Sequence, residues 1–299
     1  MSWGLCTYRR DADPANEHVG ALRLADGVIV ALPVELPGGL VAALGSWTEW
    51  SPQLRDWDPS NAEAVSDAVL LAPLRYPAKV ICAGANYRKH ITEMGAPGVD
   101  PDWKAWFFQK PPTTTVIGPT DDVLIDPDPS QQIDWEGELG VVIGTRCRNV
   151  SVAEAANVIA GYTVVNDVSA RGPHYRATSF ARPFDYDWLA SKGQDTFCPI
   201  GPSVVPAWLV DPANLQLKLW VNDELKQNET TGDMILSCAE LVAAASELVT
   251  LEPGDLIATG TPSGVGASKG TFLSHGDVVT VEITGLGRLR NRIQNRAKP

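Results

Sequence analysis

Short apolar runs separated by turn-forming residues fill most of the chain after residue 78. The runs are rich in β-branched residues and are bounded by glycine, proline and aspartate, a pattern typical of strands joined by turns. We predict strands in segments 79–86, 138–146, 160–168, 215–223, 255–260 and 278–287. The pair Asn222-Asp223, between two of these polar-apolar alternations, predicts a hairpin turn.

Two segments have the periodicity of amphipathic helices instead. These are 151–160 (SVAEAANVIA) and 235–249 (ILSCAELVAAASELV), in which apolar positions recur three and four residues apart. Because the strands outnumber the helices and do not alternate with them, a doubly wound parallel sheet is disfavoured. The pattern predicts a β-rich α+β protein.

Residues 1–75 form a small N-terminal α+β domain in this interpretation, and residues 76–299 form the larger domain. The segment 19–33 alternates and turns at Asp26-Gly27, which predicts a hairpin. The segments 40–47 and 59–71 give weaker helical patterns.

Composition and charge narrow the function classes. The 299 residues are 44% hydrophobic and 20% charged, as in an ordinary globular protein, and the formal net charge is −12. Such a surface repels nucleic acid and anionic membranes, so we expect neither as a partner. The five scattered cysteines lack C-x-x-C spacing, and the N-terminus has no apolar signal-peptide core. A reduced, cytoplasmic protein is expected.

Carboxylates near two of the predicted strands are candidates for chemistry. Glu136 and Glu138 lie two apart, and positions two apart on a strand face the same side, where two carboxylates repel unless a cation lies between them. Asp167 ends another apolar run. Three oxygen ligands without His or Cys favour Mg²⁺ or Mn²⁺, or Ca²⁺. A solvated edge strand and a turn-forming aspartate are the plain alternatives.

Further candidates are weaker when taken singly. His90 and Glu93 have the i,i+3 spacing that lets a carboxylate orient an imidazole, a spacing that is also common in surface helix contacts. Lys192 is a lone lysine beside a glycine, and most such lysines are solvated. The glycine-rich turn 260–266 offers backbone N–H groups to an anion, or is a simple loop.

In their order along the chain, these segments resemble the catalytic domain of the fumarylacetoacetate hydrolase (FAH) family. The matching motifs include IDWEGELGVVIG, GYTVVNDVSAR and LEPGDLIATGTPSGVG, and the resemblance covers residues 78–296. The chain is similar in particular to the branch of FAH-domain-containing and 2-hydroxyhepta-2,4-diene-1,7-dioate isomerase-like proteins. The resemblance implies an FAH-type mixed β-sandwich roll preceded by a small domain, and a homodimer.

The resemblance also implies roles for individual residues. It places the divalent metal on Glu136, Glu138 and Asp167, and His90 with Glu93 as the pair that activates a water. Lys192 resembles the lysine that stabilises negative charge on the substrate. The predicted substrate contacts are Arg171, Gly260, Thr261 and Lys110, the last without a defined role.

A small 2-oxo acid is the implied substrate, and three functions stay open. The first is hydrolysis of a carbon–carbon bond in an acylpyruvate-like or fumarylacetoacetate-like 1,3-diketo acid. The second is decarboxylation or isomerisation of a 2-hydroxy-2,4-dienedioate in aromatic catabolism. The third, of another class, is an inactive binding protein on this fold. The segment 172–190 is longer than in shorter family members and leaves substrate identity open.

Overall fold

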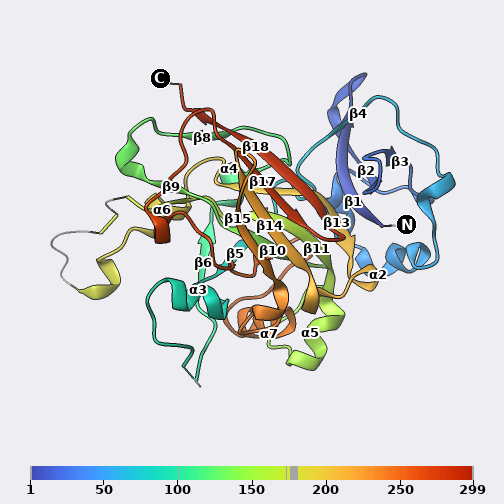
Figure 1. The fold of residues 1–299 in the computed structure, drawn as a ribbon. Helices are drawn as coiled ribbons and strands as arrows, with labels where there is room; N and C mark the ends of the chain where they lie inside the picture. The colour runs from blue at the N-terminus through green and yellow to red at the C-terminus, as the bar shows by residue number, and fades with distance from the viewer. Residues whose placement is uncertain (1, 101, 173, 176–180, 298–299) are drawn as a thin grey trace.

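A computed structural model describes residues 2–100, 102–172, 174–175 and 181–297. Its largest element is an 11-stranded mixed sheet with the path order β3-β2-β1-β13-β11-β10-β16-β5-β6, to which β4 and β7 add at its sides (Figure 1). The strands of this sheet are β1 (Trp3–Arg10), β2 (Asp13–Arg23), β3 (Ile29–Val30), β4 (Ala68–Leu70), β5 (Val80–Ala83), β6 (Phe107–Lys110), β7 (Val116–Ile117), β10 (Gly137–Ile143), β11 (Ile159–Asn166), β13 (Cys198–Pro206) and β16 (Leu256–Ala258).

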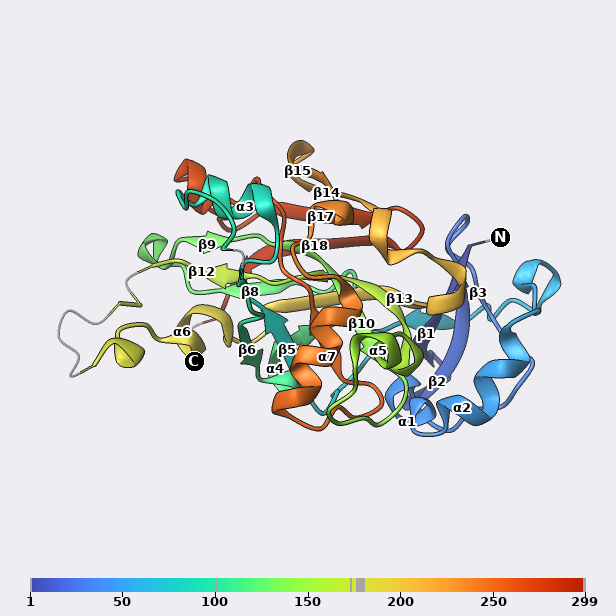
Figure 2. The same ribbon diagram turned by 90° about the horizontal axis from the view of Figure 1, so that it is seen from below.

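A five-stranded sheet stacks on this large sheet, and a two-stranded ribbon lies near its end. The five strands, in the order β15-β14-β17-β18-β8, are β8 (Val123–Ile125), β14 (Gln216–Val221), β15 (Glu224–Thr230), β17 (Val278–Ile283) and β18 (Gly287–Asn295). The ribbon pairs β9 (Ile133–Asp134) with β12 (Ser169–Ala170). Figure 2 shows β14, β15, β17 and β18 on one side of β10 and β13.

Helices are short, and the two longest cover the opposite side. They are α1 (Leu40–Leu44), α2 (Trp47–Trp50), α3 (Arg88–Glu93), α4 (Pro112–Thr115), α5 (Val152–Val158), α6 (Trp188–Lys192) and α7 (Cys238–Leu248), with eight 3-10 turns between them in the described part of the chain. Helices α5 and α7 lie beside each other below the large sheet in Figure 2. Each begins with a capping box, from Ser151 and Ser237 respectively, which satisfies N–H groups that the first turn leaves free.

Apolar alternation places the main core between the two sheets. Leu139 and Val141 of β10, two apart and fully buried, belong to one cluster with Leu217 of β14 and Val281 of β17. Val142, which points to the other face, belongs to a second cluster with the N-terminal residues. The β-rich α+β class and the sandwich architecture are therefore confirmed.

The predicted local elements are present with one exception. All six predicted strand segments contain strands, both predicted helices form, and the two hairpins turn at Asp26-Gly27 and Asn222-Asp223. The helical prediction for segment 59–71 is wrong. The segment forms a 3-10 turn, Pro59–Asn61, and the edge strand β4, because pairing with β1 overrides a weak local preference.

The N-terminal segment is continuous with the rest of the fold. Strand β1 pairs with β13 opposite Val204, and N-terminal residues such as Leu5 and Leu40 share a buried cluster with Val142 and Leu256. The division into domains 1–75 and 76–299 stays a prediction. No helix in the described residues is long and apolar enough to cross a membrane.

Candidate metal centre and active site

The antiparallel pairing of β10 with β11 builds the carboxylate cluster. Gly137, at the start of β10, lies opposite Asn166, at the end of β11. Residues just outside these strand ends are therefore neighbours, and the Asp167 N–H donates to the Glu136 carbonyl at 2.9 Å. Carboxylate oxygens of Glu136, Glu138 and Asp167 lie within 4.8 Å of one another, and all three side chains are buried.

Basic side chains pair with two of these three carboxylates. Lys192 Nζ lies 2.7 Å from Glu136 Oε2 and 2.7 Å from Asp167 Oδ2. Lys110 Nζ lies 2.6 Å from Asp167 Oδ1, and Arg171 also pairs with Glu136. Burial opposes the charged form of Glu136, but Lys192 and Arg171 outweigh it and lower its pKa.

Glu138 has a different environment. It is 1% exposed, and its carboxylate accepts a 2.8 Å hydrogen bond from the Gly260 N–H, but no basic side chain of the described residues pairs with it. Burial, with Asp167 and Glu136 nearby, raises the pKa of Glu138 well above its ordinary value. A buried acid facing two other carboxylates without a counter-charge fits a site for a divalent cation.

The three carboxylates therefore fit a hard cation on chemical grounds. Their oxygens converge, they include no nitrogen or sulfur ligand, and Glu138 lacks the cationic partner that the other two have. Oxygen-only sites of this kind suit Mg²⁺ and Mn²⁺.

Lys192 is held as a permanent cation. Burial disfavours its charge, but Asp167 and Glu136 outweigh burial and raise the pKa of Lys192 above its ordinary value. The side chain lies at the end of α6, and its ammonium also lies over the Phe108 ring at 5.1 Å from the centroid. Such a group stabilises negative charge but does not deliver a proton near neutral pH.

Lys110, whose role the sequence left undefined, is fully engaged by the protein. Its Nζ donates to the carbonyls of Val168, Lys192 and Phe197 at 2.9, 2.6 and 2.8 Å, besides its ion pair with Asp167. Its side chain is 0% exposed. It therefore joins three segments around the carboxylates, and it is not among the residues that line the cavity described below.

Arg171 is likewise occupied. Its Nε donates to Asp134 Oδ2 at 3.1 Å, while its terminal nitrogen pairs with Glu136. Asp134 is buried and also accepts from the backbone N–H groups of Gly266 and Ala267. The sequence pattern alone did not single out Asp134, although it stands two residues before Glu136. Arg171 orients Glu136 in this arrangement, and its predicted contact with substrate stays a prediction.

The candidate water-activating pair lies on the short helix α3. His90 Nδ1 is 3.4 Å from Glu93 Oε2, so Nε2 is the ring nitrogen left without that partner. Glu93 accepts from the Gly264 N–H at 3.0 Å and from Ser268 Oγ at 2.8 Å. Strands β5 and β16 run parallel, so their carboxyl ends lie at the same end of the sheet. Helix α3 follows β5 and the glycine-rich turn follows β16, so the two segments meet there.

The glycine-rich turn after β16 does bind anions, but they are the protein's own carboxylates. Gly260 donates to Glu138 and Gly264 donates to Glu93. Thr261 Oγ1 donates to the Gly137 carbonyl at 3.0 Å and accepts from Gln227 Nε2 at 2.9 Å. Gln227, which no sequence pattern marks, also accepts from the Gly137 N–H and thereby connects the turn to β10.

These groups share one cavity of about 430 Å³. The polar and charged residues of its lining include His90, Glu136, Glu138, Arg171, Lys192 and Thr261, and its large apolar residues are Met94, Trp103, Trp106, Phe108 and Trp188. Asp167 and Lys110 are not among the lining residues and act from behind them. The long segment 172–190 contributes Trp188, and part of that segment lies outside the described residues.

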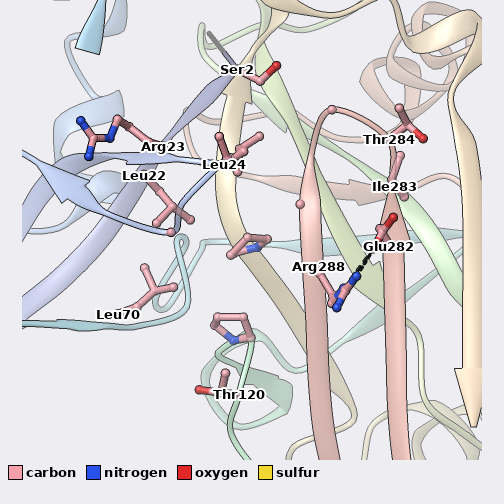
Figure 3. Close-up of a pocket in the computed structure, with 16 residues that line it drawn as sticks. Ser2, Leu22, Arg23, Leu24, Leu70, Thr120, Glu282, Ile283, Thr284 and Arg288 are labelled. Atoms are coloured by element: carbon pink, nitrogen blue, oxygen red, sulfur yellow. Dashed lines mark hydrogen bonds and ion pairs between the residues drawn. The ribbon is translucent and has the colours of Figure 1, made fainter. Parts of the chain in front are cut away.

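A larger cavity of about 690 Å³ lies elsewhere, between the N-terminal strands and the β17–β18 turn (Figure 3). Within the described part of the chain, the two cavities have no lining residue in common. The charged lining residues of the larger cavity are already paired: Glu282 with Arg288 at 2.6 Å, and Arg23 with Asp26 at 2.8 Å. Its larger volume therefore does not make it the active site. The cluster of buried titratable groups favours the carboxylate cavity as the active site instead.

Comparison with known proteins agrees with this site. A family model described as fumarylacetoacetate (FAA) hydrolase C-terminal matches residues 79–294. The chain belongs to the fumarylacetoacetate hydrolase family. The match covers the strands and turns that carry each candidate site residue.

Relatives in the family carry several activities in their names. The chain is 40% identical over 231 residues to oxaloacetate tautomerase fahd2, mitochondrial, of Xenopus laevis, which covers 76% of this chain and 69% of the relative. The structure is similar to 2-hydroxyhepta-2,4-diene-1,7-dioate isomerase of Mycobacterium marinum, with a TM-score of 0.75, 32% identity, and coverage of 99% of this chain and 100% of that one.

A third relative has a metal bound. Maleylpyruvate hydrolase of Sphingobium sp. SYK-6, in complex with manganese(II) and pyruvate, aligns with a TM-score of 0.74 and 29% identity over 98% of this chain and 100% of that one. Family members are thus enzymes that include hydrolases, isomerases and tautomerases.

Proposed function

We propose that the protein is a divalent-metal-dependent hydrolase that cleaves a carbon–carbon bond in an acylpyruvate-like 2,4-dioxo acid. The convergence of Glu136, Glu138, Lys192 and His90 on one cavity supports this proposal most strongly. The manganese and pyruvate in the related maleylpyruvate hydrolase are consistent with it.

The proposed cofactor is Mg²⁺ or Mn²⁺, with Ca²⁺ as a weaker candidate, held by Glu136, Glu138 and Asp167. When bound, such a cation supplies Lewis-acid stabilisation of negative charge that develops on a substrate oxygen. Glu138 provides the carboxylate that pairs with no basic side chain of the described residues. Lys110 holds Asp167 in position, and Arg171 holds Glu136.

In this mechanism His90 takes a proton from a water molecule through Nε2, while Glu93 holds the imidazole by its Nδ1–H. The water oxygen forms a bond to the C4 carbonyl carbon, and the C3–C4 bond then breaks. The electron pair of that bond passes into the three-carbon enolate, and the proton that His90 took from water then passes to C3, which gives pyruvate and a carboxylic acid. Lys192 stabilises the enolate charge as a fixed cation.

A second candidate is enol–keto tautomerisation of a 2-oxo dicarboxylic acid. It is favoured by the relatives named oxaloacetate tautomerases. The reaction needs only proton transfer between C3 and an oxygen, which His90 with Glu93 could perform without attack by water. Decarboxylation or isomerisation of a dienedioate uses the same groups, and the isomerase-named neighbour supports isomerisation in the same way.

His90→Ala separates these roles from metal binding. We expect kcat/KM for acylpyruvate hydrolysis to fall roughly 100-fold or more, the contribution typical of a general base, and the Mn²⁺ dissociation constant to change less than about twofold. Product identification by chromatography distinguishes hydrolysis from tautomerisation or decarboxylation. His275→Ala, outside the cavity, is the matched control and keeps parental rates.

An equal loss of activity and metal affinity in His90→Ala would contradict the assigned role of the imidazole. If no acylpyruvate in a panel releases pyruvate with Mg²⁺ or Mn²⁺, and enol-oxaloacetate is turned over, the tautomerase replaces the hydrolase as the proposed function. No turnover and no metal-dependent stabilisation would identify an inactive binding protein. The homodimer and the cytoplasmic location stay predictions.

A further inference from the structure

One wall of the active-site cavity is made of aromatic rings. Trp106, Phe108 and Trp188, which we call the aromatic wall, line it together. The ring centroids of Trp106 and Trp188 are 4.6 Å apart, and those of Phe108 and Trp188 are 5.3 Å apart. The three rings therefore form one continuous apolar surface that faces the same cavity as Glu136 and Glu138.

The aromatic wall is built on the elements that carry the site lysines. Trp188 begins α6 and Lys192 ends it, four residues later, so both side chains lie on one face of the helix. Phe108 stands two residues before Lys110 on β6, and such positions share a face of a strand. The wall is consequently fixed in position relative to the carboxylates.

Gly84 makes room for the third ring. A Cβ at Gly84 would lie 2.3 Å from Cε3 and 2.7 Å from Cζ3 of Trp106, so the indole packs directly on the glycine backbone. The Gly84 N–H also donates to the Trp106 carbonyl at 2.8 Å. Trp106 is thus held in place by backbone contacts, although 46% of it is exposed.

The basic side chains that line the cavity are either bound to carboxylates or exposed. Arg171 and Lys192 are bound to carboxylates of the site. Lys104 is the remaining lysine of the lining, and it is exposed to solvent. Among the described residues, no buried, uncommitted cation is therefore placed to receive a second carboxylate beside the aromatic wall.

We propose that the aromatic wall selects 2,4-dioxo acids whose acyl group is apolar and about the size of a phenyl ring. This inference rests on the proposed function. The cavity volume of about 430 Å³ lies in the range of roughly 300–1,000 Å³ that holds drug-sized ligands, which leaves space beyond a three-carbon oxo acid. Trp106 and Trp188, 46% and 40% exposed, keep apolar surface that such a tail would cover.

Three substrates that differ only in the acyl tail test the proposal with the Mn²⁺-loaded protein. They are 2,4-dioxo acids carrying phenyl, methyl or a carboxylate-ended alkenyl group at C4. We expect kcat/KM for the phenyl compound to exceed that for each of the others at least tenfold, since even one methylene in an apolar pocket changes kcat/KM by roughly 10- to 200-fold.

Substitutions test whether the aromatic wall produces the preference for the phenyl substrate. Trp188→Ala is expected to lower at least tenfold the ratio of kcat/KM for the phenyl substrate to kcat/KM for the methyl substrate. Leu189→Ala, next along α6 but 65% exposed and outside the cavity lining, is the matched control and keeps the parental preference. Gly84→Ala, which displaces Trp106, is a second route to the same loss if Trp188→Ala folds poorly.

A binding measurement separates this inference from the proposed function. Phenylpyruvate is expected to bind the Mn²⁺-loaded protein at least tenfold more tightly than pyruvate in calorimetry, whether or not hydrolysis occurs. If hydrolysis fails but this preference holds and depends on Trp188, the proposed function is wrong and the aromatic wall stands. Hydrolysis without a phenyl preference overturns the inference. A preference for the carboxylate-ended tail that is lost in Lys104→Ala also overturns it.

Discussion

Glu138→Gln should have opposite effects on stability with and without metal. In the protein without metal, the Glu138 side chain is buried beside Glu136 and Asp167 and accepts one hydrogen bond, from the Gly260 N–H, with no basic partner among the described residues. The neutral amide removes that unfavourable environment and keeps the shape. The same change removes one of the three anions that hold the cation.

The expected magnitudes follow from burial and from mass action. A buried polar group left without adequate partners costs about 1–3 kcal/mol, so the chelator-treated variant should be more stable by about that amount. For 299 residues at roughly 2.1 cal/mol/K per residue, this raises Tm by about 2–5 °C. Metal at 100 times its Kd stabilises the parent by about 2.7 kcal/mol, or roughly 4 °C, and the variant should lose this rise.

The pH dependence has a definite sign. Burial, with Asp167 and Glu136, raises the pKa of Glu138 in the folded protein above the ordinary value of 4.5. The folded state then holds a proton that the unfolded state has released, so this group contributes less stability as the pH rises above about 4.5. The advantage of Glu138→Gln over the parent should therefore grow from pH 4.5 toward neutral pH, and metal binding to the parent should release a proton.

Scanning calorimetry of chelator-treated protein, with and without Mn²⁺ and at several pH values, measures all three effects. Glu282→Gln, a surface glutamate paired with Arg288, is the control and should keep both the parental Tm and the full metal-induced rise. A Glu138→Gln protein that is less stable than the parent without metal, and still gains stability from Mn²⁺, would refute the assignment of Glu138 as the unpaired anion of the site.

Two other substitutions test how the site is supported. Lys110→Met removes a buried ammonium that is bound to three carbonyls and a carboxylate, and we expect a loss of about 3–5 kcal/mol in guanidinium unfolding. Lys89→Met, which removes a 59% exposed side chain paired with Glu229, should cost about 0–1 kcal/mol, and equal losses would contradict the buried network. Gly260→Ala places a Cβ 2.9 Å from that of Asn86 at φ +93°, so kcat/KM should fall at least tenfold. Gly285→Ala, at φ +80°, places a Cβ that meets no described residue within 4 Å beyond its chain neighbours, so it should cost stability but not activity.

The candidate chemistry was accessible from sequence only as separate fragments. Alternation predicted that Glu136 and Glu138 share a side, because this depends on the two-residue period of a strand and on nothing distant. Helical spacing likewise brought Glu93 to His90. The family motifs assigned these residues and Lys192 to one site, but spacing along the chain gives no distance between segments.

Pairing between strands decided the rest. Asp167 reaches Glu136 because Asn166 lies opposite Gly137, and the register of β10 and β11 follows from the buried faces of both strands. The roles of Lys110, Asp134 and Gln227 also depend on contacts between distant segments, so no local pattern marks them.

The sequence by itself determined six strand segments, the two longest helices, two hairpin turns and the residue types able to hold a hard cation, because periodicity, turn chemistry and ligand preference are local properties. Only the tertiary structure decided that, of the three carboxylates, Glu138 is the one that pairs with no basic side chain of the described residues. Only it brought Trp106, Phe108 and Trp188 together in the lining of the cavity that Glu136 and Glu138 share. Both outcomes depend on which buried surfaces meet, and that is settled by packing of the whole chain.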